Sequence, residues 1–121
     1  MCIVTHMSDI KDLTDKIIKF RDERDWKQFH NPKDSALSLI LEAAELLEHF
    51  QWKNQEEMGT YIKTNQQDIA EELADVLYWV LLISHDLEID IKQALEKKMK
   101  KNAEKYPLEK AKGRHTKYDR L

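Results

Sequence analysis

The stretch NPKDSALSLILEAAELLEHFQW, residues 31–52, decides the fold class of this 121-residue chain. Asn31 followed by Pro32 is a strong helix start, because asparagine caps free amide groups and a proline at the first helical position loses no hydrogen bond. No glycine and no further proline interrupts the stretch, so we expect one helix that extends to about Trp52. The whole chain has only two glycines and two prolines, which favours long helices throughout. The sequence therefore predicts an all-α fold.

Three further helices are predicted on either side of this stretch. Before it, apolar residues at helical spacing indicate an amphipathic helix that ends at about Asp22. After it, capping-box spacing at Thr64 opens a helix that extends to about His85. The last helix begins after the capping residue Asp90 and ends at Pro107, which cannot continue a helix. These elements predict a fold similar to a four-helix bundle.

A length of 121 residues predicts one domain, which we place at residues 9–110. Residues 1–8 are expected to be an extension or disordered, residues 54–63 a polar connecting helix or loop, and residues 111–121 a basic, aromatic tail. A chain this small buries a modest share of its surface, and long amphipathic helices often pack against another subunit. We therefore expect a homo-oligomer.

Charge and hydropathy exclude several classes of partner. The 20 basic and 23 acidic residues give a net charge of −3, too balanced to indicate non-specific binding to nucleic acid or to an anionic membrane. No stretch approaches the roughly 18 apolar residues of a membrane span. The single cysteine, Cys2, cannot form an internal disulfide. We expect a cytoplasmic protein that binds neither nucleic acid nor membrane.

Two pairs of carboxylates occupy one face of the second and of the third predicted helix. Glu42 and Glu45 are three residues apart, as are Glu72 and Asp75, so each pair shares a helix face. Both pairs border apolar residues, where charge repulsion and lost hydration raise carboxyl pKa values unless a cation is present. Glu71 is also one helical turn from Asp75, and spacing alone does not separate it from Glu72.

The composition of these pairs favours a hard metal ion. Ligands that are all oxygen suit Mg²⁺, for which Mn²⁺ can substitute, and Mg²⁺ commonly completes its shell with substrate phosphates. A di-iron carboxylate bundle would instead need Glu-x-x-His pairs, and no histidine follows Glu42, Glu45 or Glu72 by three residues. The expected substrate is therefore a polyphosphate.

Four segments in this order resemble the MazG-like nucleotide pyrophosphohydrolases, and in particular their short, single-domain branch, which includes enzymes that hydrolyse dCTP. The segments are ERDWKQFHNPKD (residues 23–34), EAAELLEHFQW (42–52), EELADVLYW (71–79) and KMKKNAEKYP (98–107). The resemblance implies Mg²⁺-dependent hydrolysis of a (deoxy)nucleoside triphosphate, with dCTP-like substrates among the candidates, to the monophosphate and pyrophosphate. It also implies an assembly of two or four chains.

The resemblance assigns metal ligation to Glu42, Glu45, Glu72 and Asp75, and so selects Glu72 over Glu71. Within this set we assign catalysis to Glu45 and Glu42, and we choose Glu45 to orient or deprotonate the attacking water. Spacing does not separate a base from a ligand, so both roles stay open for Glu45.

The aromatic positions of the family's nucleoside pocket fall on Trp26 and Trp52, and His30 lies beside Trp26 in the same loop motif. Trp79 aligns with a tyrosine of the family and Ile17 with a histidine, two departures that concern base preference rather than the metal. A tryptophan is more often a core or interface anchor, but an aromatic face also stacks on any base.

Lys98, Asn102 and Lys105 share one face of the fourth predicted helix and match the family's last segment. Two cations and an amide suit the oxygens of a phosphate group, although such a face is often only solvated. The alternative to an enzyme is a helical interaction module, in which the acidic residues merely keep an oligomer soluble.

Overall fold

A computed structural model describes residues 9–121, so the predictions for residues 1–8, Cys2 included, lie outside the described part. The elements in chain order are α1 (Asp9–Glu23), η1 (Lys27–Phe29), α2 (Pro32–Glu48), α3 (Gln55–Asp86), α4 (Ile91–Lys105), α5 (Leu108–Ala111) and η2 (Tyr118–Arg120). Residues 9–121 contain helices and no strand, which confirms the predicted all-α class. None of these helices is both long enough and apolar enough to cross a membrane.

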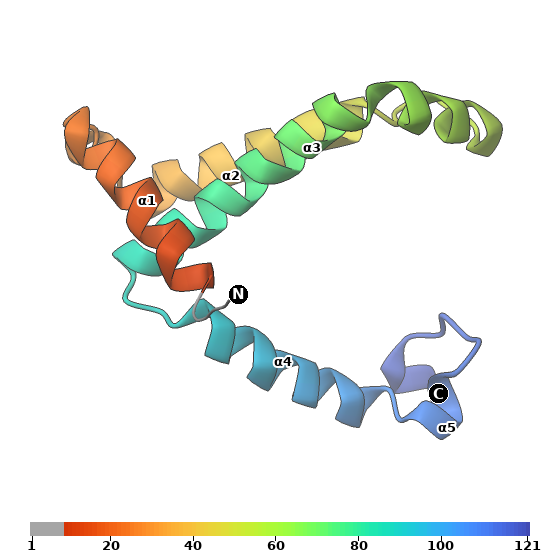
Figure 1. Ribbon diagram of the computed structural model, residues 1–121. Helices are drawn as coiled ribbons and strands as arrows, with labels where there is room; N and C mark the ends of the chain where they lie inside the picture. The colour runs from red at the N-terminus through yellow and green to blue at the C-terminus, as the bar shows by residue number, and fades with distance from the viewer. Residues whose placement is uncertain (1–8) are drawn as a thin grey trace, which may run out of the picture. The chain divides into compact units, whose positions relative to one another are not determined.

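The described residues form two compact units, one that ends at Glu88 and one that begins at Ile89. In the first unit α2 runs along α3, and α1 packs against α3 as well (Figure 1). Its apolar core is small, with Leu81 and Leu82 fully buried, and it also encloses the charged side chain of Arg21. The first unit is therefore built around α3.

Helix α2 begins as the sequence predicts but ends earlier. The Asn31 side chain accepts a hydrogen bond of 2.9 Å from the amide of Asp34, as expected of a cap. The predicted end at Trp52 is wrong, because α2 ends at Glu48 and the chain then turns. Trp52 adopts a φ of 68°, the left-handed conformation that interrupts a right-handed helix.

Helix α3 begins about ten residues before the predicted start at Thr64. A capping box opens it: the Asn54 side chain accepts a hydrogen bond from the Glu57 amide, and the Glu57 carboxylate accepts one from the Asn54 amide. The signal at Thr64 instead coincides with a kink, since the adjacent Asn65 has non-helical φ and ψ of −123° and 23°. Residues 54–63, predicted as a polar helix or loop, thus supply the cap and the first turns of one bent helix that ends at Asp86.

Several large apolar side chains on α2 remain uncovered in this chain. Four large apolar residues on one side of α2 form an outer stripe, and each is more than half exposed. The stripe consists of Leu37, Ile40, Leu41 and Leu47. Apolar side chains at helical spacing normally face a packing partner, so this stripe is a candidate interface.

The second unit contains α4, α5 and η2. The cap predicted at Asp90 is present, since its side chain accepts a hydrogen bond of 3.0 Å from the Gln93 amide. Helix α4 ends before Pro107, as predicted. The C-terminal tail folds back on α4: the Tyr118 ring meets Tyr106 edge to face at 6.1 Å, and the Lys105 Nζ lies 4.8 Å from the centre of the Tyr118 ring.

Candidate active site

Four carboxylates from α2 and α3 converge in the first unit. One oxygen from each lies within 4.8 Å of the corresponding oxygen of every other member. The carboxylate cluster consists of Glu42, Glu45, Glu72 and Asp75. Residues three apart on each helix share a face, and the packing of α2 along α3 brings the two faces together. Glu71, the competing residue in the sequence, is exposed and lies outside the cluster.

The close approach of these acids changes their protonation. Burial raises the pKa of Glu42 to about 7, aided by a hydrogen bond with Glu45 and by the charges of Asp75, Glu45 and Glu72. Burial also raises the pKa of Glu72, again with a hydrogen bond to Glu45, whereas His49 acts in the opposite direction. Glu45 therefore contacts an acid on its own helix and one on α3.

The cluster fits a hard cation. Two of its buried oxygens, Oε2 of Glu42 and Oε2 of Glu72, have no hydrogen-bond partner among residues 9–121. Buried carboxylate oxygens without a partner are costly, and a divalent ion satisfies them while it cancels their mutual repulsion. Because every donor is an oxygen, the set suits Mg²⁺ or Mn²⁺ better than a soft metal.

A cavity of about 550 Å³ opens beside the carboxylate cluster. Aromatic side chains make much of its wall. They are Phe20 on α1, Trp26 just before η1, and Tyr78 and Trp79 on α3. Asp75 lines the same cavity, so one residue belongs both to the aromatic cavity and to the carboxylate cluster. The aromatic cavity can therefore hold a flat, apolar group next to the carboxylate cluster, which suits a metal ion that also binds phosphate.

Only some of the nucleoside-binding residues predicted from the sequence meet here. Trp26, His30 and Trp79 line the aromatic cavity, as does Ile17, which stands where the family has a histidine. Trp52 does not line it, and with 91% of its surface exposed it stands out from the turn between α2 and α3.

The residues predicted to bind phosphate belong to the second unit. Lys98, Asn102 and Lys105 all lie on α4, and the contact of Lys105 with Tyr118 is internal to that unit. Their role toward the carboxylate cluster stays a prediction.

Comparison with known proteins identifies the family. Residues 37–121 match the sequence model of the MazG-like family. The chain belongs to the MazG-like family. It is 37% identical to dCTP pyrophosphatase 1 of Mus musculus and 36% identical to that of Homo sapiens, in each case over 105 residues, 85% of this chain and 62% of the relative. The chain thus spans less than two thirds of the length of these relatives.

A solved structure gives the same result for the fold of this MazG-like chain. The structure of a pyrophosphatase from Archaeoglobus fulgidus DSM 4304 superposes with a TM-score of 0.79 at 39% sequence identity. The superposition covers 87% of this chain and 98% of the other. The MazG-like fold assigned from the sequence is therefore confirmed.

The MazG-like chain also holds two groups of polar contacts near the site that sequence reasoning did not find. The His49 Nδ1 and the Tyr61 hydroxyl are 2.6 Å apart, and the His49 Nε2 lies 3.9 Å from an oxygen of Glu72. His49 thus stands between Tyr61 and one member of the carboxylate cluster. Its position one turn after Glu45 on the same helix face was the available signal.

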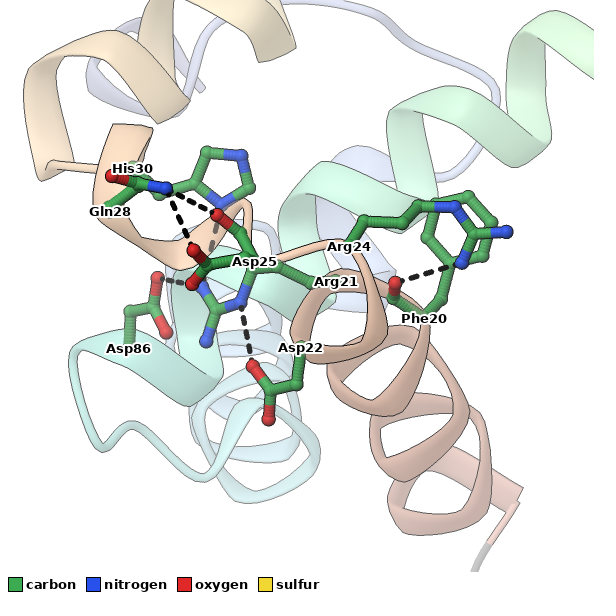
Figure 2. Close-up of polar contacts among 8 residues, drawn as sticks. All are labelled: Phe20, Arg21, Asp22, Arg24, Asp25, Gln28, His30 and Asp86. Atoms are coloured by element: carbon green, nitrogen blue, oxygen red, sulfur yellow. Dashed lines mark hydrogen bonds and ion pairs between the residues drawn. The ribbon is translucent and has the colours of Figure 1, made fainter.

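The second group centres on the ion pair of the buried Arg21 with Asp86, next to His30 of the aromatic cavity. The Arg21 Nη1 donates a hydrogen bond of 2.7 Å to Asp86 and lies 3.5 Å from the Nδ1 of His30 (Figure 2). Arg21 is only 1% exposed, although it lies on an amphipathic helix whose sequence pattern does not distinguish it from solvated neighbours. Phe20 and Tyr78, also missed as site residues, were recognisable only as apolar positions of their helices.

Proposed function

We propose that this chain hydrolyses nucleoside triphosphates to the monophosphate and pyrophosphate, with Mg²⁺ held by Glu42, Glu45, Glu72 and Asp75. The observation that carries the proposal is the shared residue Asp75, which joins a cluster suited to metal and triphosphate to an aromatic cavity suited to a base. The names of the relatives, dCTP pyrophosphatase 1 and a pyrophosphatase, support the same reaction. Mn²⁺ is expected to substitute for Mg²⁺.

When bound, the metal neutralises charge on the triphosphate and makes water easier to deprotonate. Glu45 is the residue we assign to orient the attacking water and to receive its proton, with Glu42 as its partner. Two hydrogen-bonding relationships support this choice, since Glu45 interacts with both Glu42 and Glu72. Glu42 and Glu72 both have raised pKa values, so each tends to hold a proton. A carboxylate that is hydrogen-bonded to both, as Glu45 is, is suited to take up a proton and pass it on.

The base of the substrate is proposed to enter the aromatic cavity, with Trp26 and Trp79 as stacking surfaces and His30 at its edge. Ile17, which lines the same cavity, makes that part of the wall apolar. A dCTP-like substrate is the first candidate, because the curated relatives act on dCTP by their names.

The triphosphate is proposed to contact Lys98, Asn102 and Lys105, which supply two cations and an amide to phosphate oxygens. We also propose that the chain acts as a homo-oligomer of two or four copies, since the outer stripe of α2 remains exposed in one chain. Trp52 is then proposed to stack on a base held by another copy, because it does not line the cavity of its own chain.

A screen of pyrophosphate release across the ribo- and deoxyribonucleoside triphosphates, with Mg²⁺ or with chelator, tests the proposal. We expect release with Mg²⁺ and at least about a hundredfold loss in Asp75→Asn, which removes a ligand. Glu71→Gln is the matched control, since Glu71 is an acid on the same helix outside the carboxylate cluster. Equal rates for the parent and Asp75→Asn, or no release from any triphosphate, would count against the assignment.

Calorimetry separates this enzyme from the alternative of a helical interaction module. The enzyme must bind Mg²⁺ together with a non-hydrolysable nucleoside triphosphate, whereas an interaction module need bind neither.

A further inference from the structure

Arg21 is a charged residue in the interior whose role the metal chemistry does not explain. It comes from α1, where Asp22 lies 3.8 Å from its Nε. Its nearer ion-pair partner Asp86 is the last residue of α3, and His30 lies in the connection between η1 and α2. Asp86 is 27% exposed, whereas Arg21 is 1% exposed, so the guanidinium depends on these partners for its stabilisation. The three residues tie together three separate segments of the first unit.

The contact with Arg21 constrains where His30 carries its proton. A guanidinium has only donor groups, so the Nδ1 atom that faces Arg21 can serve only as an acceptor. A neutral imidazole has one N–H, which must then be on Nε2. The doubly protonated form is disfavoured as well, because burial and then the charge of Arg21 lower the pKa of His30, with Asp86 opposing them.

His30 stands between two cavities. One is the aromatic cavity, and the other, of about 400 Å³, is lined by Asp86 and Ser35 among others. Asp86 lines only the smaller cavity, so the Nδ1 edge of His30, which meets the Arg21–Asp86 pair, is directed to that side. His30 also lines the aromatic cavity, and its ring meets Trp79 edge to face at 5.4 Å, so we infer that the opposite edge of the ring, with Nε2, is the edge available to this cavity.

We propose that Arg21 is a positioning residue that fixes His30 as a neutral imidazole with its proton on Nε2, so that His30 donates one hydrogen bond to the base of the substrate. The atom recognised is an acceptor on the edge of the base, either a carbonyl oxygen or an unprotonated ring nitrogen. A histidine that is free to change tautomer could equally well accept a hydrogen bond from a donor on the base. By fixing the tautomer, Arg21 makes His30 selective for an acceptor, in addition to any contribution to stability. This role rests on the proposed function, because it assumes that a base enters the aromatic cavity.

The tautomer is measured directly in the free protein by long-range ¹H–¹⁵N NMR of the full chain labelled with ¹⁵N-histidine. His30→Gln identifies the His30 signals. We expect the chemical shift of an unprotonated nitrogen for Nδ1 and of a protonated nitrogen for Nε2. A proton on Nδ1, or an even mixture of tautomers, in the parent chain overturns the proposal without the need for any folded variant.

The double variant Arg21→Met/Asp86→Leu tests whether the ion pair sets this tautomer. It removes both charges together and so leaves no buried charge without a partner. We expect a mixture of His30 tautomers in this variant and no change in the control Lys19→Gln, which removes an exposed charge from the same helix. An unchanged tautomer in the double variant overturns the role of Arg21.

Binding measurements separate the effect on the base from a general loss of structure. With Mg²⁺ present, we expect the double variant to bind a non-hydrolysable nucleoside triphosphate roughly tenfold more weakly. Its affinity for inorganic triphosphate, which has no base, should stay within about twofold of the parent. Equal losses for both ligands overturn the positioning role, whereas a parent chain that binds neither ligand contradicts the proposed function and leaves the tautomer result standing.

Discussion

Asp75 and Trp79 lie one helical turn apart on α3, and both line the aromatic cavity, but only Asp75 also belongs to the carboxylate cluster. Because residues four apart on a helix lie about 6 Å from each other, α3 sets the spacing between the proposed metal site and the proposed stacking surface at Trp79. The distance between the two halves of the proposed substrate is thus determined by one turn of one helix.

Removal of metal should make the stability of the chain depend on pH in the direction opposite to ordinary acid denaturation. The pKa of Glu42 is about 7 in the folded chain, against 4.5 for the ordinary group, so the folded state holds its proton more tightly. This contribution is fully present below pH 4.5 and is lost as the pH rises through 7. Calorimetry of the chelated protein should show a Tm that falls between pH 5 and pH 8.

Mg²⁺ should reverse this loss at pH 8, because it stabilises the ionised cluster. Glu42→Gln, which has no titrating group at this position, is expected to flatten the pH dependence. A Tm of the chelated parent that rises between pH 5 and pH 8, and does so equally in Glu42→Gln, would contradict the assignment.

The two single substitutions of the Arg21–Asp86 ion pair should lower the free energy of unfolding by different amounts. Asp86→Leu leaves Arg21, at 1% exposure, with only the exposed Asp22 as an ion-pair partner, 3.8 Å from its Nε. We expect it to lower the free energy of unfolding by about 3–5 kcal/mol. Arg21→Met leaves the Asp86 carboxylate without its partner, but this group is partly hydrated, so the loss of free energy of unfolding should be smaller. Urea denaturation measures both, and the double variant should recover part of the loss; a larger cost for Arg21→Met would contradict this reasoning.

The outer stripe of α2 should hold copies of the chain together. A charge at Ile40 would be desolvated in an apolar interface, so Ile40→Asp is expected to shift the protein toward a monomer in sedimentation equilibrium. Lys19→Asp serves as the control, since it introduces the same side chain at an exposed polar position of the first unit. An unchanged mass for Ile40→Asp would exclude this stripe as the interface.

Lys98 should contribute to binding of the triphosphate and not to folding. Lys98→Gln removes one proposed phosphate contact, and we expect KM to rise roughly tenfold with little change in Tm. Lys100→Gln removes an equal charge from another face of α4. Steady-state kinetics of the two variants should therefore differ, and equal KM values would indicate that α4 presents only a solvated lysine face.

The sequence predicted those parts of the fold that depend on local chemistry. Asn31 and Asp90 cap the helices that they were expected to cap, because a side chain bonded to an amide three residues later needs no distant partner. The end of α2 was not predictable in this way, since it depends on the turn at Trp52 that leads into the capping box of α3.

The site was predictable where one helix face carried several residues of one kind. The spacing of Glu42 and Glu45, and of Glu72 and Asp75, indicated the carboxylate cluster before any contact was known. Arg21 gave no such signal, because its burial results from where the end of α3 meets α1, far away in the sequence.

The left-handed backbone of Trp52 and its proposed stacking role place opposite demands on a single residue. An L-residue with φ near 68° is disfavoured by about 1 kcal/mol or more, a cost that glycine largely avoids. Trp52→Gly should therefore match or exceed the parent in Tm, while the loss of the proposed stacking surface weakens nucleotide binding. Stabilisation by design is therefore limited at this position. The substitution that relieves the backbone strain also removes the exposed indole ring.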